Sequence, residues 1–175
     1  MSQYFVLANS NKREYFGPGD FGEELSGYCF PQGGYMHIHG LALLVCRTDN
    51  ILGSPNRWGT LAGAWAGDTV VAVGDEASAE EHDMVMMEYG NIGHKVLIML
   101  CEGDLVCDDE DDFIPTIVRA SKDGGKSSLL RTLGCAALVA GYKPLEEELH
   151  RQWGPGWVAK YHEEMESWGK FYRLG

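Results

Sequence analysis

The segment from Gly63 to Asp75 constrains the fold more than any other part of the chain. It reads G-A-W-A-G-D-T-V-V-A-V-G-D, with small residues first, then β-branched residues between two glycine–aspartate pairs. Runs of β-branched residues favour strands, and glycine–aspartate pairs favour tight turns. The segment therefore predicts a β-hairpin in which Trp65 anchors the core or a sheet face. Gly67 would supply the positive φ of the turn, and Asp68 would cap a strand.

The residues before this segment predict a second pair of strands. Tyr4–Ala8 has the pattern of a buried strand, and Arg13–Phe16 is expected to return beside it after a polar turn. Gly40–Cys46 fits either a buried strand or a short buried helix, because periodicity does not separate the two. His94–Cys101 is short and apolar on nearly every side, which favours a helix.

The residues after position 126 have the pattern of helices. A serine at 127 or 128 can cap a helix that runs to Ala140 and stops at Gly141. Pro144, followed by three glutamates, begins the next helix. The last helix carries an apolar face of four residues: Trp157, Tyr161, Met165 and Trp168.

The 175 residues have the length of one domain. We expect a single domain over 1–175, made of a β-rich front (1–101), an acidic and glycine-rich connector (102–125) and a helical back (126–175). The predicted fold class is α+β, with a mainly antiparallel sheet from the N-terminal half covered by helices from the C-terminal half.

Acidic residues outnumber basic ones by 26 to 14, giving a formal net charge of −12. This balance opposes direct binding to nucleic acid or to an anionic membrane, and it suits a protein that docks on a basic partner. The five cysteines form no C-x-x-C pair, and no apolar stretch is long enough to span a bilayer. The start of the chain lacks the pattern of a signal peptide. We therefore expect a soluble, cytoplasmic protein with reduced thiols.

His37 and His39 form a candidate ligand-binding pair. If Tyr35–His39 is a strand, the two imidazoles lie on one face, a spacing that metal ligands use. A metal site needs further ligands, and the sequence does not place any of the other histidines or cysteines beside the pair. Two surface or loop histidines are the simpler interpretation, and no metal or cofactor is expected.

Three other residues are candidates for binding. Asp68 and Asp75 could lie near each other across the hairpin as an acid/base pair, although aspartates at turns commonly only cap strands. Trp58 follows Arg57 in a loop and is a candidate for an exposed aromatic contact.

No familiar catalytic motif is present. The segment D-G-G-K-S-S at 123–128 has Ala120 where a phosphate-binding loop needs glycine, so a linker with a serine cap is the simpler interpretation. The chain has no G-x-S-x-G, no G-x-G-x-x-G after a strand and no H-E-x-x-H. Catalytic residues therefore stay unassigned, and the sequence favours a protein that is not an enzyme.

Two segments resemble a known group of proteins. These are Y-F-V-L-A-N at 4–9 with K-R-E-Y at 12–15, and W-A-G-D at 65–68 with Val70 and V-G-D at 73–75. They are similar to an uncharacterised group of small, mostly bacterial proteins that open with such a strand pair and carry a similar hairpin. The resemblance covers roughly the first 100 residues. It implies a shared β-rich front and assigns no chemistry.

The leading functional hypothesis is an acidic domain that binds another protein, with an inhibitor or immunity-type binder of a basic partner as one version. The alternative is a small hydrolase or ligand-binding domain with a site near His37, His39, Asp68 and Asp75. The alternative requires these four side chains to meet in one concave pocket.

Overall fold

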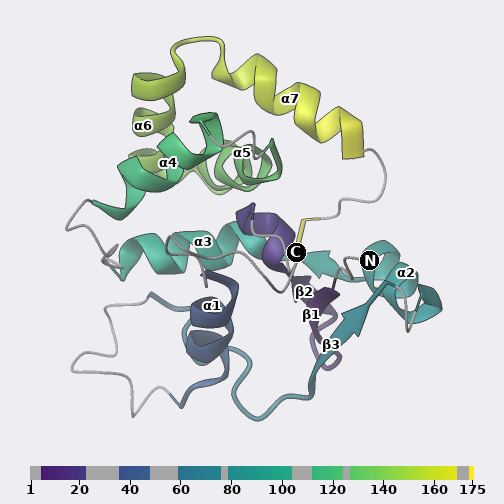
Figure 1. The fold of residues 1–175 in the computed structure, drawn as a ribbon. Coiled ribbons are helices and arrows are strands. Elements are labelled where there is room, and N and C mark those ends of the chain that lie inside the picture. The colour runs from purple at the N-terminus through teal and green to yellow at the C-terminus, as the bar shows by residue number, and fades with distance from the viewer. Residues whose placement is uncertain are drawn as a thin grey trace.

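The computed structural model describes residues 5–22, 36–47, 59–75, 79–103, 112–123, 127–168 and 174–175. Over these ranges the chain has an α+β fold in which a four-stranded sheet lies beside stacked helices (Figure 1). All four strands lie within the first 91 residues, and most of the helices follow them in the chain. The predicted fold class is confirmed.

The sheet is built on an N-terminal hairpin. Strand β1 (Phe5–Asn9) pairs antiparallel with β2 (Glu14–Phe16). The side-chain Oδ1 of Asn9 accepts hydrogen bonds from the backbone N–H groups of Asn11 and Lys12, each at 3.0 Å. This closes the turn in the way expected of asparagine. The predicted N-terminal hairpin is therefore confirmed over its described residues.

Two further strands complete the sheet. Strand β3 (Val70–Gly74) pairs antiparallel with the other side of β1, and β4 (Gly90–Asn91) runs parallel to β2. The strand order is β3-β1-β2-β4, so β3 and β4 are the edge strands. The sheet is mixed, with two antiparallel pairings and one parallel pairing.

The two faces of the sheet bury different clusters. Phe5 and Leu7 of β1 pack toward the main core, whereas Val6 and Ala8 point to a smaller cluster. This alternation follows from the two-residue period of a strand. Helix α2 (Ala79–Glu88) contributes Val85 to the smaller cluster, so α2 covers that face.

The prediction of a hairpin over residues 63–75 is wrong in its first half. Residues 59–67 form successive turns, and the partner of β3 is β1. Gly59, Gly63 and Gly67 have φ values of 66°, 76° and 85°, which a strand does not adopt. The predicted positive φ of Gly67 and the anchoring role of Trp65 are confirmed. The Trp65 ring is fully buried, and its Nε1 donates to Glu14 Oε2 at 2.9 Å.

Helices α1 (Met36–Val45) and α3 (Gly93–Glu102) pack together on the main-core side of the sheet. Gly40 permits this contact, because a Cβ there would lie 2.4 Å from Val96 Cγ1. The predicted helix over 94–101 is confirmed by α3. For residues 40–46 the sequence left both strand and helix open. The structure shows a helix there, α1, over residues 36–45.

The C-terminal helices form a layer above α3 in the view of Figure 1. The layer comprises α4 (Phe113–Asp123), α5 (Ser127–Gly134), a π-helical continuation (Cys135–Val139), α6 (Lys143–Trp153) and α7 (Trp157–Trp168). Pro144 lies in the first turn of α6, and Gly141 has a φ of 70°, both as expected. The helical pattern predicted after residue 126 is confirmed.

Two predictions of chain organisation need correction. The expected connector over 102–125 contains α4, whose apolar face buries Phe113, Ile117 and Val118 at helical spacing. The front is mixed rather than β-rich, because α1, α2 and α3 lie within it beside short strands. A 3-10 helix, Pro18–Phe21, also lies in this front part, directly after β2.

The end of the chain returns to the sheet at β4. Leu174 forms a parallel bridge with Asn91, and the Gly175 N–H donates to the Asn91 carbonyl at 2.8 Å. A Cβ on Gly90 would lie 2.5 Å from Gly175 Cα, so glycine is required for this approach. Residues 174–175 therefore cover the outer edge of β4.

Candidate functional site

The structure does not bring the predicted histidine pair together. His37 and His39 lie on helix α1 rather than on a strand, and residues two apart on a helix point in nearly opposite directions. His37 is buried at 2% exposure, whereas His39 is exposed. The two imidazoles therefore do not form the shared face on which a two-histidine ligand set depends.

Asp68 and Asp75 are separated by the whole of strand β3. The strand has five residues, so its length alone is roughly 13 Å. Asp68 accepts a hydrogen bond from Asn9 Nδ2 at 2.8 Å and lies 3.9 Å from Lys12 Nζ. The proposed acid/base pair across a hairpin turn is not formed. Trp58, the remaining candidate, lies outside the described residues.

A buried polar cluster lies between the sheet and the C-terminal helices. Asp20, in the 3-10 helix, accepts hydrogen bonds from the Gly17 N–H at 2.8 Å and from Asn91 Nδ2 at 3.0 Å. Asn91 Oδ1 in turn accepts from the Gly93 N–H at 2.8 Å. A Cβ on Gly93 would lie 2.7 Å from Asp20 Cγ, so this glycine makes room for the carboxylate.

Charge compensation inside this cluster comes from Arg131 of α5. Burial raises the pKa of Asp20, and the Arg131 guanidinium is the main influence that lowers it. Burial, reinforced by the Asp20 charge, raises the pKa of Tyr15 to about 12. The ring of Trp168 covers Arg131, with the guanidinium carbon 4.1 Å from the ring centroid. The Asp20 cluster therefore joins the sheet to α5 and α7 as a structural element.

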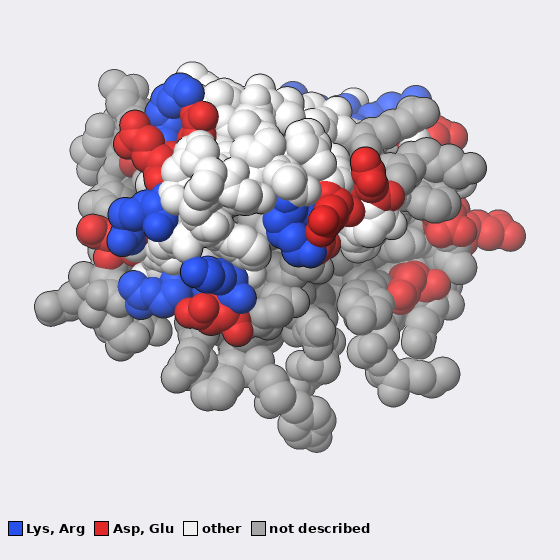
Figure 2. All heavy atoms as spheres, turned by 90° about the horizontal axis from the view of Figure 1, so that it is seen from above, with Lys and Arg blue, Asp and Glu red and all other residues white. Residues whose placement is uncertain are grey.

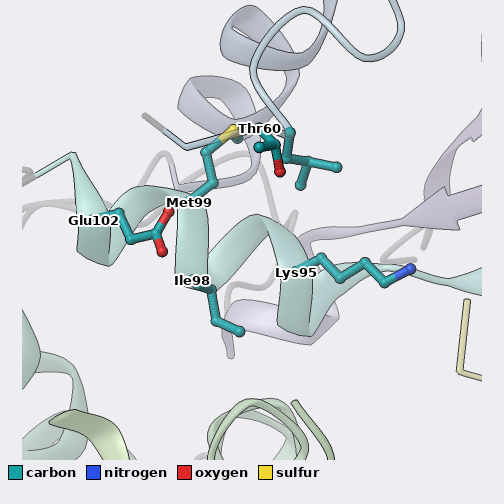
Figure 3. Close-up of a pocket in the computed structure, with 6 residues that line it drawn as sticks. Thr60, Lys95, Ile98, Met99 and Glu102 are labelled. Atoms are coloured by element: carbon teal, nitrogen blue, oxygen red, sulfur yellow. The ribbon is translucent and has the colours of Figure 1, made fainter. Parts of the chain in front are cut away.

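Figure 3 shows a shallow cavity of about 210 Å³ along helix α3. Its lining includes Lys95, Ile98, Met99 and Glu102, which recur at the spacing of one helix face, and Thr60 lies opposite. The side chains of Lys95 and Glu102 extend from opposite ends of this row. This cavity does not place a nucleophile, a base and an orienting group together.

A second hollow of about 340 Å³ lies between α4 and α6 and is lined by Arg119, Lys122, Asp123, Arg151 and Gln152. Its cations already have protein partners. Lys122 Nζ donates to the Gln152 carbonyl at 2.8 Å, and Arg151 Nε donates to Glu148 Oε2 at 2.8 Å. Neither cavity contains His37, His39, Asp68 or Asp75 in its lining. The geometry therefore does not favour a hydrolase or ligand-binding site at those residues.

The charged groups over the C-terminal layer are mixed in sign. Figure 2 looks down on this layer and shows basic and acidic groups side by side, with an uncharged area between them. Lys143 pairs with Glu146, and Lys160 Nζ lies 2.7 Å from Glu163 Oε2. Such pairs at i and i+3 cancel much of the local field.

Helix α2 differs from this layer in the composition of its exposed side. We define the α2 surface as the exposed residues Glu80, Glu81, Asp83, Met84 and Met87. Glu80, Met84 and Met87 follow one another at i, i+4 and i+7, so they form one row along the helix. Met84 and Met87 are 38% and 49% exposed. The α2 surface therefore combines negative charge with accessible apolar side chains.

The α2 surface matches no sequence motif, but the composition of the surrounding segment carries a signal for it. From Trp58 to His94 the chain has no Lys or Arg and seven acidic residues: Asp68, Asp75, Glu76, Glu80, Glu81, Asp83 and Glu88. Among the described neighbours, Arg13 contacts Glu88 at 3.1 Å at the far end of α2. Nearer the start of α2, His82 Nδ1 lies 3.8 Å from Asp83 Oδ1, and Glu80 and Glu81 of the first turn are exposed.

The described residues form neither a metal site nor a membrane-spanning helix. Within the ranges that the structure describes, no group of His, Cys, Asp or Glu side chains is placed to bind a metal ion. None of the described helices combines the length and the apolar character needed to cross a membrane. No protein-family model, no curated protein and no solved structure matches this chain.

Proposed function

We propose that this protein is an interaction domain that binds a basic protein partner through the α2 surface. The observation that carries the proposal is the unbalanced charge of the segment from Trp58 to His94, where seven acidic residues occur with no Lys or Arg. A field of one sign attracts a partner of the opposite sign and speeds their encounter.

The two exposed methionines add the apolar part that a docking surface needs. Burial of apolar area is the main source of affinity in protein association, and methionine adapts its shape to different partners. Met84 and Met87 stand among Glu80, Glu81 and Asp83 on the exposed side of α2. A partner helix, strand or loop with basic and apolar side chains would match both features.

The opposite side of α2 holds the surface in place. Val85 is 2% exposed and packs with Val73 and Tyr89 against the sheet. The helix is therefore attached to the sheet through residues that are not part of the α2 surface. Substitutions on the exposed side should change binding without removing the apolar contacts that stabilise the helix.

The test compares two charge reversals of equal size. Glu80→Lys with Glu81→Lys changes the α2 surface, and Glu147→Lys with Glu166→Lys makes the same change in net charge at exposed positions of α6 and α7. Immobilised wild type and both variants are used to capture proteins from cell extract at increasing salt, and circular dichroism confirms that each variant is folded.

The expected result is capture of a basic protein that weakens as salt is raised. Its affinity should fall about tenfold or more for the α2 variant, a loss of about 1.4 kcal/mol, and change little for the control. Equal loss in both variants would assign the effect to the net charge of the whole protein. Undiminished capture by the α2 variant, or no captured basic protein, would contradict the proposal.

A further inference from the structure

We infer that the basic partner adds an extended segment to the outer edge of strand β3, next to the α2 surface. This inference rests on the proposed function and specifies how the partner is held. Strand addition supplies main-chain hydrogen bonds, while side chains of the added segment meet charges on the receiving protein.

The hydrogen-bond register shows which groups of β3 face outward. The Ser10 N–H donates to the Thr69 carbonyl at 3.1 Å, so this opposed pair is a hydrogen-bonded pair. Such pairs alternate along an antiparallel ladder, and Ala8 opposite Val71 and Val6 opposite Val73 are the next two. The N–H and C=O groups of the intervening residues, Val70, Ala72 and Gly74, therefore point away from β1.

The outward groups of β3 face no other strand within the described structure. β3 is the first strand in the order β3-β1-β2-β4, and among the described residues β1 is its one strand partner. Ala72, at the centre of the strand, is exposed. An edge of this kind presents a row of backbone donors and acceptors to any extended chain that fits.

The acidic residues beside β3 favour one kind of added segment. Asp68 and Asp75 lie at the two ends of β3, and α2, with its exposed Glu80, packs against the same strand. A second copy of this protein pairing through β3 would bring these negative groups together, which opposes self-association. An extended segment with Lys or Arg at alternate positions would instead place cations beside them.

The test uses two labelled heptapeptides with the sequence Lys-Val-Lys-Val-Lys-Val-Lys. One is unmodified, and the other is N-methylated on four successive central amides, so that neither of its edges can donate a full set of hydrogen bonds. The two peptides have the same charge and side chains. Fluorescence anisotropy measures their affinity for the wild-type protein and for Glu80→Lys with Glu81→Lys.

Strand addition predicts that the unmodified peptide binds at least tenfold more tightly than the methylated one. Hydrogen exchange provides a readout that needs no variant: peptide binding should slow exchange of the Ala72 amide at least tenfold. The amides of Val71 and Val73, already bonded to β1, should change little.

A substitution gives an independent check. Ala72→Pro removes the outward donor at the centre of the edge, and proline is tolerated at such positions of edge strands. It should weaken binding of the unmodified peptide at least tenfold, whereas the control Ala72→Val, which keeps the donor, should bind as wild type does.

The possible outcomes separate the two proposals. If both peptides bind equally to wild type and neither binds to the α2 variant, the partner is held by charge and strand addition is wrong. If neither peptide binds to wild type, the proposed binding of basic partners at this site is also contradicted. Unchanged exchange at Ala72 in a protein that binds the peptide would overturn strand addition alone.

Discussion

The two edges of the sheet differ in what lies against them. The outer edge of β4 is occupied by Leu174 and Gly175 of the same chain, and Asn91 of β4 belongs to the buried Asp20 cluster. The outer edge of β3 has no strand partner among the described residues and lies between aspartates. Residues 174–175 cover the edge at β4, whereas the edge at β3 is flanked by Asp68, which lies 3.9 Å from Lys12 Nζ, and by Asp75. The charged edge is the one that can still accept a partner.

The largest expected loss of folding stability comes from a substitution on the β4 side of the sheet. Asp20→Ala removes a buried carboxylate that accepts hydrogen bonds from Gly17 and Asn91 and interacts with the buried charge of Arg131, which should lower the free energy of unfolding by about 3–5 kcal/mol. Asp68→Ala, the counterpart beside β3, removes a partly exposed hydrogen-bond acceptor of Asn9 and should cost about 1 kcal/mol. Urea unfolding of both variants measures the difference, and similar losses would contradict the contrast between the edges.

The next largest effect is a dependence of the free energy of unfolding on pH, which arises from His94, shortly after β4. Burial, together with Lys95, lowers the pKa of His94 from 6.5 to about 4. Between about pH 6.5 and pH 4, the unfolded chain therefore binds a proton at His94 more readily than the folded protein does. The contribution of neutral His94 to folding stability is fully present above about pH 6.5 and is lost as the pH falls toward 4. The full loss is about 3 kcal/mol.

His94→Gln should flatten this part of the stability curve, measured by urea unfolding at a series of pH values. The comparison with wild type is needed because the raised pKa of Asp20 favours protonation of the folded state, which acts in the opposite sense as pH falls. A wild-type slope that persists in the variant would show that His94 is not its source.

A smaller effect is expected from Gly90→Ala. The new Cβ would lie 2.5 Å from the backbone of Gly175, so residues 174–175 must shift away from β4. The expected cost is about 1–3 kcal/mol, with faster hydrogen exchange at the Gly175 amide. Gly19→Ala is the control, because a Cβ there meets nothing within 4 Å. Unchanged exchange at Gly175 would contradict the close approach of the two glycines.

The smallest effect is expected at the β3 edge. Ala72 is exposed, and Ala72→Thr adds a residue that favours strands, so unfolding free energy should change by less than about 0.5 kcal/mol. Thermal and urea unfolding provide the measurement. A loss above about 1 kcal/mol would show that the edge is packed against other parts of the protein.

Local patterns predicted those elements whose formation depends on nearby residues. The β1–β2 hairpin follows from an apolar strand and the turn at Asn9–Asn11, and α6 follows from Pro144 and the glutamates near its start. The hairpin prediction over 63–75 failed because Gly59 and Gly63 also adopt positive φ, which turns the chain before a strand can form. Helix α4 was missed because the acidic residues and glycines of 102–125 suggested a connector.

The candidate sites were harder to predict because they depend on long-range placement. His37 and His39 share a face only in a strand, and because they lie on helix α1 the predicted shared face is not formed. The Asp20 cluster joins residues from four distant segments, and no spacing in the sequence reveals it. The α2 surface was accessible to prediction, since the absence of Lys and Arg from 58 to 94 is a local property.

The contact between Asn91 and Leu174 also has a kinetic consequence. It joins residues far apart in the sequence, so it forms only after a long loop has closed, and such contacts slow folding. During synthesis, β1 and β2 can pair before residues 174–175 emerge. The outer edge of β4 is then uncovered for a time, and newly made chains at high concentration would be most prone to aggregate through that strand.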